Sequence, residues 1–332
     1  MILYWTDPET ARTIVDIAAS ISRYAEANFC DKPMTANYSH TEPTLETLPE
    51  MAAAVEVVKA RVEGLEGHPG AYLRAMIKAF GTLVRYMAET AYSYHDAVKD
   101  ILEVDLKPIP EANFSELAAK IDSKLTEWGY TGPANQKIAA WQADKRIPAE
   151  EVTAVAGRFL DKSRIYATKR VCGLPTSEGI DSVNSIRGVY WSGLSEYLGD
   201  YQGRLTFNID RPWNEPTFAC ILTHEGYPGH HTYYTLWDHL FKQGKLPMEA
   251  AYYLIDSPTN CLFEGAPEMA IRFLGWDDPE FDTPELDPKE KEEIILAKHI
   301  MDLQRMYQTN ANYFYNVEGR SKEEVIAYML SS

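Results

Sequence analysis

Residues 223–232 read THEGYPGHHT, and this segment is the most informative part of the 332-residue chain. It holds three of the eight histidines, and a glutamate stands beside the first of them. Histidine is the commonest protein ligand of zinc, and a glutamate next to a ligating histidine is the usual partner for activating a metal-bound water. The segment therefore predicts a metal site built on His224, with Glu225 beside it.

The spacing of these histidines predicts an interrupted helix. Pro228 stands four residues after His224, so the one-turn pair of histidines of an HExxH motif is missing. His230 and His231 follow at six and seven residues, and on a regular helix they would lie about 9–10.5 Å from His224 along the axis, too far to share one ion. Pro228 and Gly229 favour a broken or widened helix at this point. Either His230 or His231 then becomes the second ligand.

A third ligand is available in residues 260–268, which read NCLFEGAPE. Glu264 stands in an otherwise apolar run, where a carboxylate is costly unless it is paired or binds a metal. Glu268 follows one helical turn later and is placed to accept a hydrogen bond from the second ring nitrogen of a ligating histidine. We expect Glu264 to complete the metal site and His239 to be structural or exposed.

The rest of the chain predicts a mainly α fold. Hydrophobic spacing and capping residues indicate a helix that starts at Asp7-Pro8-Glu9 and further helices over residues 50–65, 71–103, 115–128, 134–145, 149–171 and 288–316. Short segments at 188–191 and 204–209 have strand character, and residues 29–45 and 276–293 are expected to be loops, the second solvated. We expect a helical N-terminal region, residues 1–171, and a metal-binding catalytic region, residues 172–332, with a small β-sheet next to the motif helix.

The overall charge excludes some partners. With 32 basic and 49 acidic residues the net charge is −17, so neither a nucleic acid nor an anionic membrane is expected as a partner. No stretch approaches the roughly 20 apolar residues of a membrane span, and the N-terminus lacks the pattern of a signal peptide. The four cysteines are widely separated and form no CxxC pair, which is typical of reduced thiols and favours a cytoplasmic protein. They are Cys30, Cys172, Cys220 and Cys261.

Residues 224–231, HEGYPGHH, match the HExxPGHH motif of the DUF885 family of bacterial proteins, which look like zinc-dependent peptidases of the gluzincin type. Residues 203–208, GRLTFN, are similar to the family's strand before the motif helix, and residues 263–265, FEG, are similar to its EGW element. Ala266 stands where the family has tryptophan. The resemblance covers about residues 165–320 and implies a zincin-like metallohydrolase fold.

The resemblance also implies roles for the site residues. A Zn2+ ion would be held by His224, His230 and Glu264, where His230 corresponds to the GH ending of related HExGH sites. Glu225 would be the general base. His231 would be a further residue of the catalytic site, either behind the ligands or facing the substrate.

The reaction implied is hydrolysis of a peptide or other amide bond, so the expected partner is a peptide or small-molecule substrate. The strand that carries Asn208 would lie beside the cleft, where an edge strand can pair with an extended substrate. An amidase, lyase or isomerase acting on a small metabolite is an alternative, because the chain is shorter than most family members. A non-catalytic helical scaffold with a vestigial site is another. Candidates for stabilising an oxyanion are Tyr307, Tyr313, Tyr315 and His231, and candidates for binding a substrate carboxylate are Arg272 and Arg305.

Overall fold

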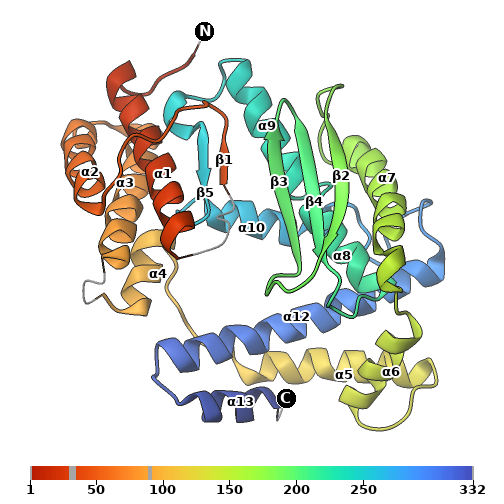
Figure 1. The fold of residues 1–332 in the computed structure, drawn as a ribbon. Coiled ribbons are helices and arrows are strands. Elements are labelled where there is room, and N and C mark those ends of the chain that lie inside the picture. The colour runs from red at the N-terminus through yellow and green to blue at the C-terminus, as the bar shows by residue number, and fades with distance from the viewer. Residues whose placement is uncertain (1, 30–34, 89–91, 331–332) are drawn as a thin grey trace.

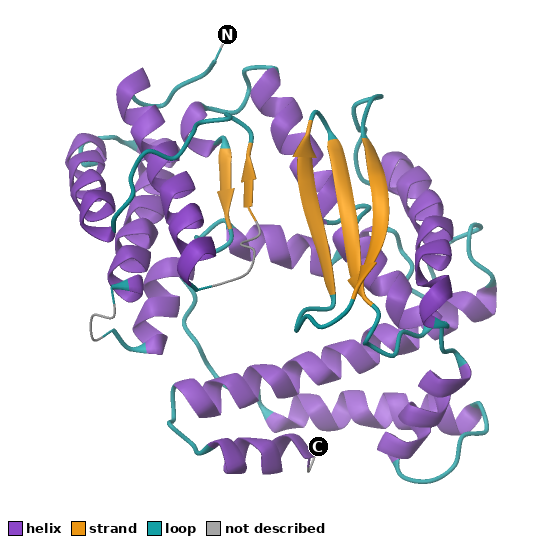
Figure 2. Cartoon of the chain, in the orientation of Figure 1, coloured by secondary structure: helices purple, strands orange, loops and turns teal. Residues whose placement is uncertain are grey.

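The computed structural model describes residues 2–29, 35–88 and 92–330, and these are mainly helical, as the sequence predicts. Figure 1 shows one group of helices beside a two-stranded sheet, and a second group around a three-stranded sheet. A layer of helices that includes the long α12 lies below both groups in this view. Figure 2 shows that strands make up only a small part of the chain. None of the helices in the described segments is long and apolar enough to cross a membrane.

The first group contains the N-terminal helices and a small antiparallel sheet in which β1 pairs with β5. Its hydrophobic core is formed by side chains of the four helices together with Met248, Tyr252 and Leu254 from much later in the chain. The elements of this group are α1 (Pro8–Asn28), β1 (Thr35–Asn37), α2 (Leu48–Val62), α3 (Gly67–Met87), α4 (Tyr94–Leu102), η2 (Met248–Ala250) and β5 (Tyr252–Leu254).

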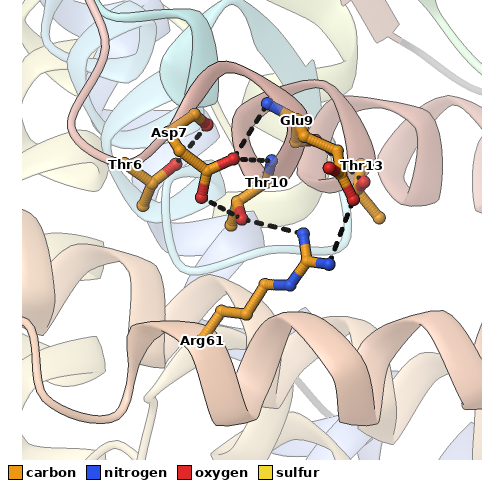
Figure 3. Close-up of polar contacts among 6 residues, drawn as sticks. All are labelled: Thr6, Asp7, Glu9, Thr10, Thr13 and Arg61. Carbon is orange, nitrogen blue, oxygen red and sulfur yellow. Dashed lines mark hydrogen bonds and ion pairs between the residues drawn. The ribbon is translucent and has the colours of Figure 1, made fainter.

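Helix α1 begins where its capping residue predicts. The Asp7 carboxylate accepts hydrogen bonds from the backbone N–H groups of Glu9 and Thr10, each at 3.0 Å. Arg61, in the last turn of α2, donates to the side chains of the same two residues, at 3.0 and 3.1 Å (Figure 3). These contacts join the start of α1 to the end of α2.

The single helix expected over residues 71–103 is wrong, because two helices occupy this range. Helix α3 ends at Met87, and α4 begins after Ser93, whose side chain accepts a hydrogen bond from the backbone N–H of Asp96 at 3.1 Å. A serine that caps a new helix competes with continuation of the old one, and hydrophobic spacing alone does not register this competition.

The second group surrounds a sheet with the order β2-β4-β3, in which β4 is parallel to β2 and antiparallel to β3. The elements of this group and of the layer below it are α5 (Glu111–Glu127), α6 (Ala134–Asp144), η1 (Ala149–Glu151), α7 (Val152–Arg170), β2 (Gly179–Ile186), β3 (Gly193–Gly199), β4 (Gln202–Asn208), α8 (Glu215–Glu225), α9 (His230–Lys242), α10 (Asn260–Glu268), α11 (Ala270–Phe273), α12 (Pro288–Asn316) and α13 (Lys322–Leu330).

The sheet differs from the expected one in two ways. Strand β4 lies where the alternation of residues 204–209 predicts it, with Leu205 and Phe207 fully buried, but it is the middle strand and has no free edge for a substrate. Residues 188–191 form a loop and not a strand, and β3 begins only at Gly193. Hydrophobic alternation identifies a buried strand, but it does not reveal which neighbours the strand will have.

The hydrophobic cores do not divide at the expected boundary of residues 171 and 172. The chain does change there from helix to strand, since α7 ends at Arg170 and β2 begins at Gly179. However, Val155 and Phe159 of α7 belong to the same core as Phe218 of α8. The elements around the motif therefore draw their support from both halves of the sequence.

The acidic segment 276–293 is anchored and not simply solvated. Trp276 is fully buried, and its ring nitrogen donates to the carboxylate of Glu285 at 2.7 Å. Arg170 donates to the same carboxylate at 2.6 Å. The expectation of a solvated loop is thus wrong for these residues, because charge composition does not show which carboxylates have a buried partner. Cys172, Cys220 and Cys261 are free thiols, and Cys30 lies outside the described residues.

Candidate metal centre

The predicted interruption of the motif helix is confirmed. Helix α8 ends at Glu225 and α9 begins at His230, so residues 226–229 form the connection. The connection is tightly folded: a Cβ atom added at Gly229 would lie 1.8 Å from the carbonyl oxygen of His224. Only glycine permits this approach of the two backbone segments, and the approach brings the first turn of α9 back to the last turn of α8.

Three of the predicted ligands meet at this junction. Nε2 of His224 lies 3.6 Å from Oε2 of Glu264, and Nε2 of His230 lies 3.7 Å from Oε1 of the same carboxylate. One ligand atom from each residue lies within 4.8 Å of the other two. Ligand atoms about 2.0–2.1 Å from a tetrahedral zinc ion are roughly 3.3–3.5 Å apart, so only small side-chain adjustments are needed. This cluster could hold a metal ion.

The charge of the third ligand suits metal binding. Burial raises the pKa of Glu264, but the contacts with His224 and His230 outweigh it and bring this pKa to about 2. The carboxylate is therefore ionised at neutral pH, as a metal ligand must be. The neighbouring Phe263 is buried and stacks on Tyr253 with ring centroids 4.1 Å apart, which anchors this part of α10.

Glu268 lies behind His224, as its position one turn after Glu264 suggests. Its Oε1 is 3.2 Å from Nδ1 of His224, the ring nitrogen that does not face Glu264. Arg305 of α12 forms an ion pair with the other oxygen of Glu268. The contact is close but not aligned as a hydrogen bond, because Nδ1 of His224 has no hydrogen-bond partner among the described residues. A small rotation of either side chain would let Glu268 accept from Nδ1, and a carboxylate in that role orients a ligating histidine. Arg305 is therefore engaged behind the ligands, and the other candidate for a substrate carboxylate, Arg272, pairs with Asp277 at 3.1 Å.

His231 does not join the cluster. Its side chain is fully buried, and Nε2 lies 3.1 Å from Oε2 of Glu178. Successive residues on a helix point about 100° apart, so His230 and His231 at the start of α9 face different directions. The structure thus brings His230 together with the other ligands, and it places His231 behind them.

Glu178 was not found by sequence reasoning. Burial raises its pKa, but hydrogen bonds from His231, Tyr227 and Arg164 outweigh burial and lower the pKa below its ordinary value. Glu178 and Arg164 lie more than 45 residues before the motif in a polar segment and on a helix, and no periodicity or motif distinguishes them.

Glu225, the proposed base, is a buried carboxylate with an unused oxygen. It is 7% exposed, and its Oε2 has no hydrogen-bond partner among the described residues. Its Oε1 faces the start of β3, since a Cβ atom added at Gly193 would lie 3.1 Å from it. A buried carboxylate oxygen without a hydrogen-bond partner costs free energy. This arrangement is therefore typical of a side chain that binds a water or a substrate.

Tyr234 is a further residue beside the ligands. Its ring stacks on that of His230 at 5.9 Å, and it lies four residues later, one turn along α9. Burial raises its pKa, and the charges of Glu225 and Glu264 contribute to the rise. The one-turn spacing from His230 was a signal present in the sequence, but among 21 tyrosines it did not stand out.

The tyrosines predicted on the last long helix have other contacts. Tyr307 packs against Phe114 of α5 at 4.5 Å, Tyr313 contacts Phe314, and the side chain of Tyr315 is half exposed. No contact in the described part of the chain joins any of the three to the ligand cluster. The structure therefore offers no support for them as oxyanion stabilisers.

Asn208 lies at the end of β4, and its side chain holds a loop. Its buried side chain donates to the carbonyl oxygens of Val189 and Trp191, at 2.7 and 3.1 Å. These bonds hold the loop that leads into β3. Asn208 therefore shapes the connection next to Gly193.

No protein-family profile, no curated protein sequence and no solved structure matches this chain.

Proposed function

We propose that the protein is a zinc-dependent, zincin-like hydrolase that cleaves amide bonds, with peptides as the substrate class. The observation that carries the proposal is the convergence of His224, His230 and Glu264 next to Glu225, a buried carboxylate with a free oxygen. Two histidines and a glutamate are a ligand set of catalytic zinc sites in hydrolases, which keep one position open. The resemblance to the DUF885 motif supports the same conclusion.

The proposed reaction gives each of these residues a separate role. His224, His230 and Glu264 would hold a zinc ion, and the chemistry it would supply there is Lewis-acid polarisation of a carbonyl group and of a water near neutral pH. As general base, Glu225 would accept a proton from the water whose oxygen adds to the carbonyl carbon, and it would deliver that proton to the amine nitrogen as the C–N bond breaks. Glu268, whose Oε1 is 3.2 Å from Nδ1 of His224, would orient the His224 ring, and Arg305 forms an ion pair with Glu268.

The edge strand β3 suits an extended substrate. The backbone N–H of Asn208 donates to the carbonyl oxygen of Ser192 at 2.9 Å, so Ser192 directs its backbone groups toward β4. In an antiparallel ladder the direction alternates, and Gly193 and Ser195 then direct theirs to the outer edge. Gly193 also adjoins Glu225, so a peptide added along this edge would present a carbonyl group near the proposed base. The free thiols of Cys172, Cys220 and Cys261 support a reducing compartment, and we propose the cytoplasm.

The test combines metal analysis with turnover. Glu225→Gln should retain zinc and lose activity by about 10²–10⁴-fold, the usual contribution of a general base. His224→Ala should lose both zinc and activity. Equal loss of zinc in the two variants would identify Glu225 as a ligand and contradict its role as the base.

The substrate class is tested separately by incubating the zinc-loaded protein with a peptide library and analysing the products by mass spectrometry. Cleavage by the wild type and none by Glu225→Gln would support a peptidase. A fully metallated protein that cleaves no peptide would overturn the assignment of substrate class. A purified protein with less than about a tenth of an equivalent of metal, and no uptake of added zinc, would make the site vestigial.

A further inference from the structure

One buried carboxylate contacts both the α8–α9 connection and the first turn of α9. Glu178 lies just before β2, and its side chain is 1% exposed. It accepts a hydrogen bond from the hydroxyl of Tyr227, inside the connection, at 2.7 Å. It also lies 3.1 Å from Nε2 of His231, the residue directly after the ligand His230. Arg164 of α7 donates to its remaining oxygen at 2.6 Å.

The connection needs such support because it has little of its own. The ladder of helical hydrogen bonds is interrupted between Glu225 and His230. The contact across it, from the backbone N–H of Thr232 to the carbonyl oxygen of Gly226, is long at 3.4 Å. Metal ligands must be held within about 0.2 Å of their ideal distances, so a connection between two ligands has to be immobilised from outside.

The position of His231 is also constrained from the opposite side. A Cβ atom added at Gly203 of β4 would lie 2.4 Å from its Nδ1, so the ring is enclosed between the β4 backbone and Glu178. The ring of Tyr227 packs edge-on against that of His231 at 5.1 Å. The two side chains thus form one unit around a single carboxylate whose charge Arg164 balances.

We propose that Glu178 is a positioning residue of the metal centre: through Tyr227 and His231 it holds residues 226–229 so that His224 and His230 point at one ion. The second histidine of the HH pair then serves the site by fixing its neighbour, and it contacts neither metal nor substrate. This inference rests on the metal centre of the proposed function, but it does not depend on which bond the enzyme cleaves.

The test compares two buried carboxylates that have lost their charge. Glu178→Gln is the variant of interest, and Glu249→Gln is its matched control. Glu249 is 4% exposed and likewise accepts from three donors, the backbone N–H groups of Trp5 and Thr6 and the hydroxyl of Thr6. It lies in η2, which packs on α1, and has no contact with the ligands among the described residues.

Zinc affinity is measured by competition with a chelating dye, and ligand geometry by the visible absorption spectrum of the cobalt-substituted protein. For Glu178→Gln we expect a loss of zinc affinity of about tenfold or more, the usual cost of losing a supporting contact, and a changed cobalt spectrum. Glu178→Asp should restore part of the affinity. Glu249→Gln should lower thermal stability and leave both metal measurements unchanged.

Two further variants keep the test decisive if Glu178→Gln does not fold. Tyr227→Phe removes one of the three hydrogen bonds, and Gly203→Ala pushes His231 from its other side; both should shift the cobalt spectrum in a folded protein. Wild-type zinc affinity and an unchanged spectrum in the folded variants would overturn the proposal. Because neither readout uses turnover, a failure of the proposed hydrolase activity would leave this result intact.

Discussion

Replacing Gly229 by alanine tests most directly whether the close backbone approach at the α8–α9 junction brings the candidate ligands together. The added Cβ atom would lie 1.8 Å from the carbonyl oxygen of His224 and 2.4 Å from that of Thr223. Ordinary van der Waals contact begins at 3.4 Å, so the first overlap must be relieved by a movement of 3.4 − 1.8 = 1.6 Å. Both obstacles are backbone atoms and cannot rotate away, so the ends of α8 and α9 must separate.

The size of the effect follows from this movement. A shift of 1.6 Å is several times the roughly 0.2 Å tolerance of a metal ligand, so His224 and His230 should no longer share one ion. We expect zinc affinity to fall more than about 100-fold, beyond what the loss of a supporting contact costs. Overpacking usually costs about 1–3 kcal/mol, and because backbone must move here we expect the free energy of unfolding to fall by about 3 kcal/mol.

Gly265→Ala provides the matched control. Gly265 directly follows the ligand Glu264 in α10, and a Cβ atom added there would have no neighbour within 4 Å. Alanine in a helix interior is more stable than glycine by about 0.5–1 kcal/mol, so this variant should bind zinc normally and unfold at the same or a slightly higher urea concentration.

The measurements are zinc competition titration and urea unfolding of the metal-free proteins. If Gly229→Ala bound zinc as tightly as wild type, the close backbone approach would not be what unites the ligands. An equal loss of affinity in both variants would point to a general sensitivity of the site to added volume, and the reasoning from the α8–α9 junction would fail.

Three further outcomes are expected. Glu268→Gln should weaken zinc binding about 10–100-fold in the same titration, because His224 loses the carboxylate that orients it; unchanged affinity would show that this contact is dispensable. The pKa of Glu178 is lowered in the folded protein, so the stabilisation by its ionised form is present above the ordinary carboxylate pKa and is lost as the pH falls through the pKa of the folded state. In urea unfolding, the difference in the free energy of unfolding between wild type and Glu178→Gln should therefore be constant from pH 5 to 7 and become smaller below about pH 4. Arg170→Met should lower the free energy of unfolding by about 3 kcal/mol, because the buried Glu285 loses its ion pair; a loss within experimental error would mean that the acidic segment is held by other contacts.

Local features of this protein could be predicted from the sequence because neighbouring residues decide them. The cap at Asp7, the buried strand β4, the start of α12 and the interruption between α8 and α9 all depend on side chains within a few positions. Proline at residue 228 removes a backbone N–H donor and clashes with the preceding turn, and glycine at residue 229 tolerates the unusual backbone angles of the break. For the same reason the candidate ligands could be named, although the choice between His230 and His231 stayed open.

Other features required knowledge of which distant segments meet. The alternation of Leu205 and Phe207 predicts burial, but only the pairing of β2 and β3 on either side makes β4 a central strand. The hydrogen bonds from the Asn208 side chain to the loop at 188–191 could not be predicted either, because they depend on the tertiary fold that places this loop beside Asn208.

The sequence by itself determined a mainly helical protein and a set of candidate metal ligands around one broken helix. Only the tertiary structure decided that His230 faces Glu264 while His231 faces Glu178, 53 residues away in the chain. The physical reason is that backbone preferences and capping act within one or two helical turns and can be recognised in a short window. The direction of a buried polar side chain is instead set by the partner that satisfies it, and that partner is chosen by the packing of the whole core.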